Sequence, residues 1–283
     1  TTASMAGKVT DASNEPIIGA TVQAVHQPSG SRYGTVTNVD GRYSIQGMRT
    51  GGPYRVEICY IGYQTVIYKD ITLQLGEVYN LNVEMSESSE LLNEVIVTAA
   101  KTKFTAEKTG ATTNISSAQI TQLPTVNRSI SDIARLSPYA NGMSFAGGDG
   151  RSTNFTIDGA NFNNNFGLSS NLPGGGNPIS MDAIEEVQVV VAPFDVRQTN
   201  FIGGGINAIT KSGTNTFRGT AYTYYRNQDM RGNRINGEDL GARSDESKTT
   251  YGFTLGGPII KNKLFFFVNY EKEKTPGEVI KYR

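Results

Sequence analysis

Residues 249–273 read TTYGFTLGGPIIKNKLFFFVNYEKE, and they decide the fold class of the chain. In the second half of this stretch one face of an extended chain holds Leu264, Phe266, Val268 and Tyr270, and the other face holds Phe265, Phe267, Asn269 and Glu271. A period of two predicts a β-strand, and PIIKNK (258–263) predicts a short turn before it. Aromatic-rich segments of about ten residues are typical of transmembrane β-strands, and a hairpin of a soluble β-sandwich is the alternative.

The residues upstream continue this pattern. NTFRGTAYTYYRN (215–227) is rich in aromatic and small residues and predicts another strand, and a polar stretch of mixed charge follows at 227–248. Short turns on one side and longer loops on the other fit a membrane barrel, so residues 214–283 are predicted to form about three barrel strands. A barrel in lipid must close and needs at least about eight strands, so we expect these residues to be part of a longer chain.

The composition favours a β-rich protein. The chain has 283 residues, which allows one to three domains, and it contains 32 Gly, 14 Tyr, 12 Phe and no Trp. No apolar run reaches the length of about 18 residues that a transmembrane helix needs. The formal net charge is +0, which argues against nucleic acid as the main partner.

Cysteine and histidine each occur once. Cys59 cannot form an internal disulfide, and we expect it to be a small buried residue in a strand. His26 has no second His or Cys at a ligand spacing, so no transition-metal site is predicted.

No pattern of an enzyme is present. The glycine clusters FAGGDG, LPGGGN and FIGGGIN do not match a nucleotide-binding loop. There is no G-x-S-x-G motif, and a single His makes a Ser-His-Asp triad improbable. We therefore predict no catalytic residue, no metal and no cofactor.

Residues 1–86 are predicted to form a small β-sandwich. Turn signals separate about seven short alternating segments in this span, which is the pattern of a sandwich. Tyr79, Leu81, Val83 and Met85 alternate with polar residues and predict one half-buried strand. Asp40-Gly41 predicts a tight hairpin because such turns need a positive φ.

Residues 87–113 are predicted to be a linker around a short strand-like segment. EMSESSE (84–90) is polar and acidic, KTKFTAEKTGATT (101–113) is rich in Lys and Thr, and EVIVT (94–98) between them is rich in β-branched residues. An extended segment in a polar linker is suited to β-augmentation, in which it pairs with a partner's exposed strand edge. The alternative is a terminal strand of the sandwich or of the next domain.

Residues 114–213 are predicted to be a compact α/β unit. Ser116 and Gln119 form a capping-box pattern before a helix that stops at Pro124, and Ile130, Ile133 and Leu136 share one face of a second helix. Three further segments predict strands with adjoining turns: NFTIDG (154–159), SMDAIEEVQVVVAP (180–193), which begins with one helical turn, and GGGINAITKSG (203–213).

The order of these pieces resembles a known family. GKVTDASNEPIIGATVQAV with TVTNVDGRYSIQGM and YRVEICYIGYQT resembles the carboxypeptidase-regulatory-like β-sandwich, and NEVIVTAAK resembles a TonB box. TVNRSISDIARLSPYA, TIDG, EEVQVV, GGGINAITKSGTN and GGPIIKNKLFFFVNYE, in this order, are similar to the plug and first barrel strands of TonB-dependent outer-membrane transporters. The similarity is greater to the Oar-like branch than to the SusC-like branch.

This resemblance implies a mainly β fold. It comprises an N-terminal β-sandwich, an α/β plug domain and the first strands of a transmembrane antiparallel β-barrel, which in such transporters has about 22 strands and a plugged lumen. It also implies import of an unidentified ligand across the Gram-negative outer membrane, with the sandwich in the periplasm. The chain starts with TTASMAG, so the expected signal peptide is taken to have been removed.

The resemblance assigns roles and partners to individual segments. The TonB-coupling residues would be Glu94, Val95, Ile96, Val97 and Thr98. The candidate ligand contacts in the plug are Asn161, Phe162, Asn163, Asn164, Asn165 and Phe166, for which packing against the barrel wall is the alternative. The implied partners are TonB, outer-membrane lipid and the imported ligand, with a lipoprotein or the barrel-assembly machinery as further candidates.

Two other functions remain open at this point. The chain could be an outer-membrane adhesin or interaction protein without transport, or a barrel chain captured incomplete on assembly machinery. Binding of TonB by residues 94–98 distinguishes import from adhesion.

Overall fold

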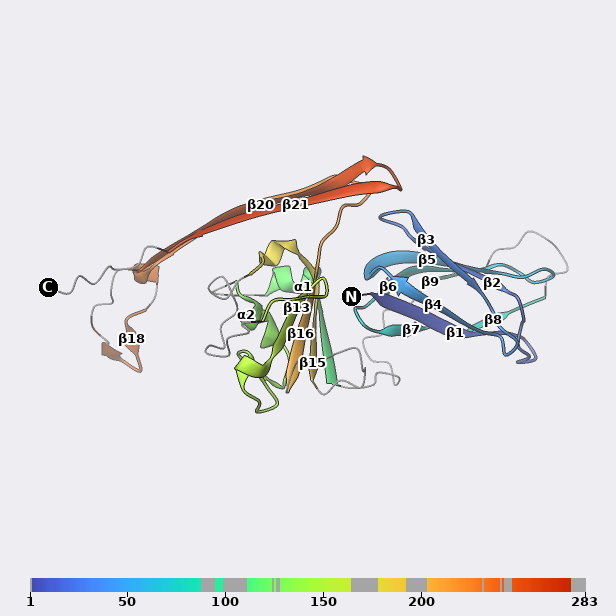
Figure 1. Ribbon diagram of the computed structural model, residues 1–283, viewed down its shortest axis with the longest axis horizontal. Helices are drawn as coiled ribbons and strands as arrows, with labels where there is room; N and C mark the ends of the chain where they lie inside the picture. The colour runs from blue at the N-terminus through green and yellow to red at the C-terminus, as the bar shows by residue number, and fades with distance from the viewer. Residues whose placement is uncertain are drawn as a thin grey trace.

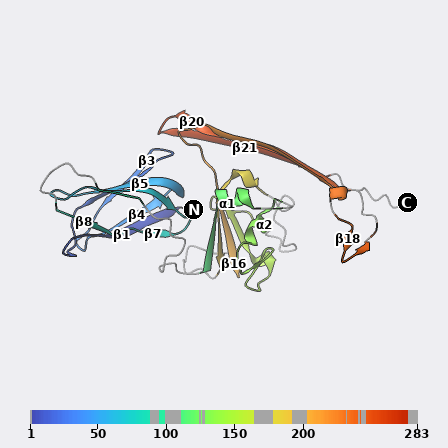
Figure 2. The same cartoon turned by 180° about the vertical axis from the view of Figure 1, so that it is seen from behind.

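The computed structural model describes residues 2–87, 95–98, 111–123, 125, 128–163, 178–191, 203–230, 232–239, 241 and 246–275. The fold is mainly β, as predicted. Figures 1 and 2 show an N-terminal sandwich at one end, a central α/β unit, and a long hairpin that extends over this unit. Among the described residues, no helix combines the length and the hydropathy that crossing a membrane requires.

The N-terminal sandwich consists of two sheets. One sheet has the order β4-β1-β7, with β8 also paired to β1, and the other has the order β3-β2-β5-β6-β9. The first eight strands are β1 (Ala3–Asp11), β2 (Thr21–His26), β3 (Ser31–Val36), β4 (Arg42–Met48), β5 (Gly51–Cys59), β6 (Val66–Leu73), β7 (Val78–Asn80) and β8 (Val83–Met85).

Alternation along the strands builds the sandwich core. Val22 and Ala24 of β2 are fully buried and lie opposite Ile58 and Val56 of β5, which are also fully buried. The Tyr43 hydroxyl donates a hydrogen bond of 2.7 Å to the carbonyl of Leu81. This bond satisfies the polar end of a buried aromatic side chain and joins β4 to the connection between β7 and β8.

Three details of the sandwich differ from the sequence predictions. The turn at Asp40-Gly41, where Gly41 has φ 71°, joins β3 to β4, and these strands belong to different sheets and form no hairpin. Cys59 ends β5 and is exposed, because the alternation places it next to the buried Ile58 on the outer face of the sheet, with Glu57. The strand predicted over 79–85 is divided into β7 and β8, which pair with successive parts of β1.

The central unit has a five-stranded sheet with the order β10-β15-β16-β13-β14. Its strands are β10 (Ala111–Ser116), β13 (Asn154–Ile157), β14 (Ala160–Asn161), β15 (Ile184–Val191) and β16 (Gly204–Thr210). The other elements are α1 (Ser117–Gln122), α2 (Ile130–Ala134), β11 (Ala140–Asn141), β12 (Ser144–Phe145) and the 3₁₀ turns η1 (Gly150–Ser152) and η2 (Met181–Ala183). A second buried core lies between this sheet and the helices.

The start of the first helix was predicted correctly, and the extent of the second helix was not. The Ser116 N–H donates to the side-chain oxygen of Gln119 at 3.0 Å, which completes the predicted capping box of α1. The second helix, α2, buries Ile130 and Ile133 but ends at Ala134. Leu136 therefore lies beyond the helix and is exposed, so it does not share the buried face.

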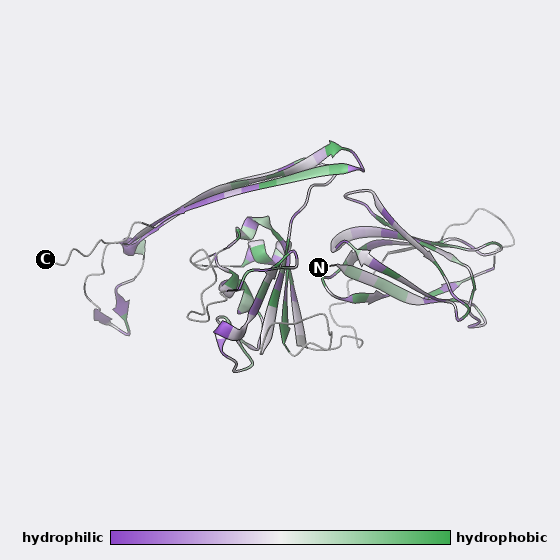
Figure 3. Cartoon of the chain, in the orientation of Figure 1, coloured by the Kyte–Doolittle hydropathy of each residue, from purple (hydrophilic) through white to green (hydrophobic). Residues whose placement is uncertain are grey.

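The C-terminal part forms a three-stranded antiparallel sheet with the order β17-β20-β21. Its strands are β17 (Arg218–Asn227), β20 (Ser247–Ile260) and β21 (Leu264–Lys274), and η3 (Gln228–Met230), β18 (Arg234–Ile235) and β19 (Glu238–Asp239) lie between β17 and β20. The turn predicted at 258–263 is shorter than expected, because β20 continues to Ile260. Figure 3 shows hydrophobic residues toward the β20–β21 turn and hydrophilic residues toward the opposite end.

Candidate functional site

The predicted coupling segment forms a strand on the sandwich. β9 (Val95–Thr98) pairs with β6 in parallel, with Val95 opposite Val66 and Thr98 opposite Lys69. It is the last strand of the five-stranded sheet. This position agrees with the alternative interpretation of the segment as a terminal strand of the sandwich. Glu94 lies outside the described residues.

The predicted ligand contacts divide into two groups. Asn161 ends β14 and is exposed, and the adjacent Phe162 has an exposed fraction of 36%. The Asn163 side chain is engaged within the domain, since its oxygen accepts a 2.6 Å hydrogen bond from the Phe155 N–H and its nitrogen donates to Asn154 at 2.7 Å. Asn164, Asn165 and Phe166 lie outside the described residues.

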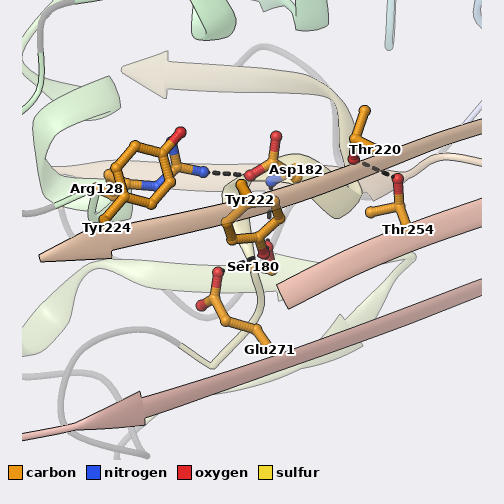
Figure 4. Close-up of polar contacts among 8 residues, drawn as sticks. All are labelled: Arg128, Ser180, Asp182, Thr220, Tyr222, Tyr224, Thr254 and Glu271. Atoms are coloured by element: carbon orange, nitrogen blue, oxygen red, sulfur yellow. Dashed lines mark hydrogen bonds and ion pairs between the residues drawn. The ribbon is translucent and has the colours of Figure 1, made fainter. Parts of the chain in front are cut away.

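A polar cluster joins the central unit to β17, the first strand of the three-stranded sheet β17-β20-β21, which is called the hairpin sheet from here on (Figure 4). Arg128 forms an ion pair with Asp182 of η2 and donates a 2.7 Å hydrogen bond to the Tyr224 hydroxyl. Its guanidinium carbon lies 4.2 Å from the centroid of the Tyr224 ring and 5.2 Å from that of Tyr222. One cation therefore binds a carboxylate and two aromatic faces, and the aromatic contacts come from β17.

The backbone at Arg128 is itself unusual. Its φ is 50°, in the left-handed region that costs an L-residue other than glycine roughly 1–2 kcal/mol. Such a conformation persists only where surrounding contacts hold it, and here the ion pair and the two tyrosine contacts do so.

Tyr222 extends the cluster across the hairpin sheet. Its hydroxyl donates to Glu271 of β21 at 2.6 Å and lies 2.8 Å from the Ser180 hydroxyl of the central unit. Gly252 of β20 makes room for this ring, since a Cβ added there would lie 2.6 Å from the Tyr222 hydroxyl. The cluster thus fixes the central unit to two of the three strands of the sheet.

The sandwich contacts the central unit through the loop after β6. The Leu75 N–H donates to Glu186 at 3.1 Å, and the Leu75 carbonyl accepts from Gln188 at 2.6 Å and from Asn114 at 3.2 Å. Glu186 and Gln188 are buried, and both lie on β15. The two domains are therefore joined by hydrogen bonds to one backbone position.

A second junction joins the sandwich to the start of the hairpin sheet. The Asn215 N–H donates to the Pro28 carbonyl at 2.8 Å. Asn215 and Asn262 also bond to each other twice, each bond being 2.8 Å long. The turn between β2 and β3 thus lies against the β20–β21 turn, as Figure 1 shows.

His26 supports this turn from inside the sandwich. Its Nδ1 lies 2.6 Å from the Ser29 hydroxyl, and its ring lies 4.9 Å from that of Tyr54. Burial, with a smaller contribution from Arg49, lowers the pKa of His26 to about 4. The imidazole is therefore neutral in the folded domain at physiological pH.

We expect the sandwich to lose stability as the pH falls below the His26 pKa of the unfolded chain. The unfolded histidine binds a proton below about 6.5, whereas the folded one stays neutral until about 4. Stability is therefore full above this window and falls by about 2 kcal/mol by pH 5. The measurement is urea unfolding of the protein and of His26→Gln at pH 7.5 and pH 5. An equal loss in the two proteins would contradict the assignment.

Comparisons with known proteins bear on the identity of these parts. Residues 4–86 match the family of the carboxypeptidase regulatory-like domain, and residues 209–278 match the family of the outer membrane beta barrel domain. The TonB-dependent transporter Oar of Myxococcus xanthus is 26% identical over 291 residues, which cover 95% of this chain and 26% of that protein. The resemblance to TonB-dependent outer-membrane transporters is confirmed.

A solved structure is also similar. The siderophore receptor PirA from Acinetobacter baumannii matches with a TM-score of 0.45 and 25% identity, over 58% of this chain and 24% of that chain. The present chain thus spans about a quarter of the length of each of these two proteins.

The comparisons also indicate the membrane in which the protein is located and the functional class of a similar protein. The protein belongs to the Gram-negative outer membrane, since residues 209–278 match an outer-membrane barrel domain. The similar protein of Myxococcus xanthus is a transporter, which agrees with the prediction that the present chain carries no enzyme site.

The faces of the hairpin sheet fit the wall of an outer-membrane barrel. The face that meets the central unit carries Thr220, whose hydroxyl lies 2.7 Å from that of Thr254, together with Tyr222 and Glu271. The other face carries exposed apolar and aromatic side chains, namely Tyr225, Tyr251, Phe253, Leu255, Val268 and Tyr270. A polar inner face and an apolar outer face are what a strand between lumen and lipid requires.

Sequence reasoning did not find the Arg128 cluster. Tyr222 and Tyr224 alternate along a predicted strand, so their common face could have been recognised. Arg128 and Asp182 are far from this strand in sequence, and nothing local indicates that they meet it. The positive φ of Arg128 has no signature in the residue type either.

Proposed function

We propose that the protein is a receptor that imports a ligand across the outer membrane, with TonB as the energy-coupling partner. The observation that carries this proposal is the order of the parts. A strand-forming segment, β9, stands between the sandwich and the central unit, which in this proposal is the plug domain, and the central unit is bonded to strands of a barrel wall. The similarity to a TonB-dependent transporter over 95% of the chain supports the same function.

The arrangement of the turns supports an orientation. The β20–β21 turn lies beside the sandwich, and the β18–β19 segment lies at the opposite end of the hairpin (Figure 1). We propose that the sandwich and the β20–β21 turn are periplasmic and that residues 227–248 face the outside. Short periplasmic turns and long external loops are usual in barrels of this type.

The test of the import function is capture by TonB in living cells. A photo-activatable residue at position 99, just after β9, is expected to cross-link to TonB when the inner membrane is energised. The same residue placed in the exposed β18–β19 turn at Asn236 is the control, since the proposed orientation puts it outside the cell. Equal cross-linking at the two positions would contradict energy coupling through this segment.

The plug contacts with the ligand remain a proposal for Asn161 and Phe162. Asn163 is less suited, because its amide already bonds to Phe155 and Asn154. Phe162→Ala is expected to slow growth under conditions in which loss of the transporter limits growth, with an unchanged amount of protein in the membrane. Tyr139→Ala removes an aromatic ring that is more exposed, 53% against 36% for Phe162, from another part of the plug domain and is the control. Normal growth of the Phe162 variant would remove this residue from the site.

One observation favours a second candidate function. β9 is paired as an ordinary edge strand of the sandwich, which a protein without energy coupling would also allow. An adhesin or interaction protein would use the sandwich and the loops to bind a surface partner. Such a protein would show no energised cross-link from position 99 to TonB.

A further inference from the structure

The segment proposed to couple to TonB, β9, is the edge strand of the five-stranded sandwich sheet and pairs with β6. Without β9, the last strand of the order β3-β2-β5-β6 would be β6, with its backbone groups unpaired on one side. Unpaired strand edges are templates for association and are usually covered. In this protein the cover is the coupling segment itself, in a defined parallel register from Val66↔Val95 to Lys69↔Thr98.

A short tether favours this pairing. The Ser86 carbonyl accepts a 2.9 Å hydrogen bond from the Gln64 N–H, and Glu87 forms an isolated antiparallel β-bridge with Tyr63. Residues 86 and 87 are thus held beside the residues that precede β6. Residues 88–94 then lead to Val95, which lies opposite Val66 at the same end of β6. Both ends of this connection are thus close together, and closing so short a loop costs little entropy. A tethered strand of this kind reaches an effective concentration in the millimolar range.

The outer face of the sheet is buried at the β6 edge. Val66 belongs to the sandwich core, so its neighbour Ile67 lies on the opposite face. Ile67 is nevertheless only 1% exposed, and its register partner is Ile96 of β9. The sheet is therefore covered on its outer face at the position where β9 pairs.

The pairing is short enough to be reversible. It comprises four register pairs, and parallel pairing is slightly less stable per residue than antiparallel pairing. A partner strand that forms a comparable number of backbone bonds, and that pulls along the chain, can displace it.

We propose that the β6 edge is a resting dock for the coupling segment, and that TonB must take β9 from this edge before it can pull on the plug domain. This inference rests on the proposed import function. The sandwich thereby sets how much of the segment is available to TonB. It adds a competing intramolecular strand to what is otherwise a simple encounter between an extended peptide and a partner.

A disulfide across the register tests the dock in outer membranes that contain the protein. Cysteines at Lys69 and Thr98 occupy register partners on one face, in a background with Cys59→Ser. Partners in neighbouring strands lie within the Cα separation of about 4.4–6.8 Å that a disulfide needs. The matched control has cysteines at Lys69 and Val97, which fall on opposite faces because successive residues of a strand alternate.

The dock predicts a disulfide in the Lys69/Thr98 pair at a level at least tenfold above the control pair. The oxidised protein should lose energised cross-linking to TonB, and reduction should restore it. Equal oxidation of the two pairs would overturn the dock. Undiminished capture of the oxidised protein would overturn the requirement for release, since TonB would then be using the open edge of β9. Absence of capture for the unmodified protein, with the disulfide still specific, would instead reject the import function.

Discussion

Replacing Val95 and Val97 together with proline is expected to abolish energised capture by TonB, with a loss of at least about tenfold. Proline removes the backbone N–H, so the double variant lacks two donors that a partner strand needs, and each hydrogen bond contributes about 1 kcal/mol. The same change also weakens the pairing of β9 with β6. A freed segment is more accessible to TonB but still lacks the donors, so accessibility does not rescue capture. The measurement is the cross-link from position 99 to TonB, normalised to the amount of protein in the membrane.

The matched control replaces the same two valines with threonine. Threonine is also β-branched and keeps the backbone N–H, so this variant retains the strand preference and the donors. We expect it to be captured within about twofold of the unmodified protein. Capture of the proline variant at the level of the threonine variant would show that TonB does not recognise the backbone of this segment.

The parts of the fold that sequence predicted correctly are those fixed by neighbouring residues. The capping box of α1 needs only Ser116 and Gln119, which lie three positions apart. The strand β15 and the Asp158-Gly159 turn after β13 likewise follow from local alternation and from local backbone preference.

The wrong predictions concern positions whose surroundings come from distant residues. Asp40-Gly41 has the residues of a hairpin turn, but the two strands that it joins pair with β2 and β1 in different sheets. Burial and pairing of this kind depend on the topology of the whole sandwich, which local pattern does not determine.

The candidate site shows the same limit. The strand character of residues 95–98 could be predicted from their β-branched composition, but their pairing with Val66–Lys69 could not. The exposed faces of the hairpin sheet could be predicted from alternation, whereas the link from Tyr222 and Tyr224 to Arg128 could not. Alternation gives the face of a strand, and only the fold gives the partner of that face.

The Arg128 cluster leads to the second large expected effect, which is detachment of the plug domain in Arg128→Ala. The side chains of Arg128 and Asp182 are 23% and 17% exposed, so removal of the cation leaves a carboxylate that is largely buried without its counter-ion. Both groups belong to the plug domain, so this loss of about 3 kcal/mol destabilises the domain itself. Loss of the hydrogen bond to Tyr224 and of the contacts with both tyrosine rings weakens the attachment to β17 by about 2 kcal/mol, so the population of the detached plug domain should rise about thirtyfold. Protease cleavage of the plug domain in outer membranes at increasing urea concentrations measures this population.

Two further variants make the result specific to the contacts. Arg151→Ala also removes an arginine from an ion pair within the plug domain, but Arg151 and Asp149 have side chains that are 52% and 46% exposed. Water and salt screen such a pair, so this variant should be cleaved like the unmodified protein. Arg128→Gly loses the same contacts as Arg128→Ala but accepts a φ of 50° without strain, so it should be the more stable of the two by about 1 kcal/mol. If Arg128→Ala and Arg151→Ala were cleaved at the same urea concentration, the cluster would not anchor the plug domain to the wall.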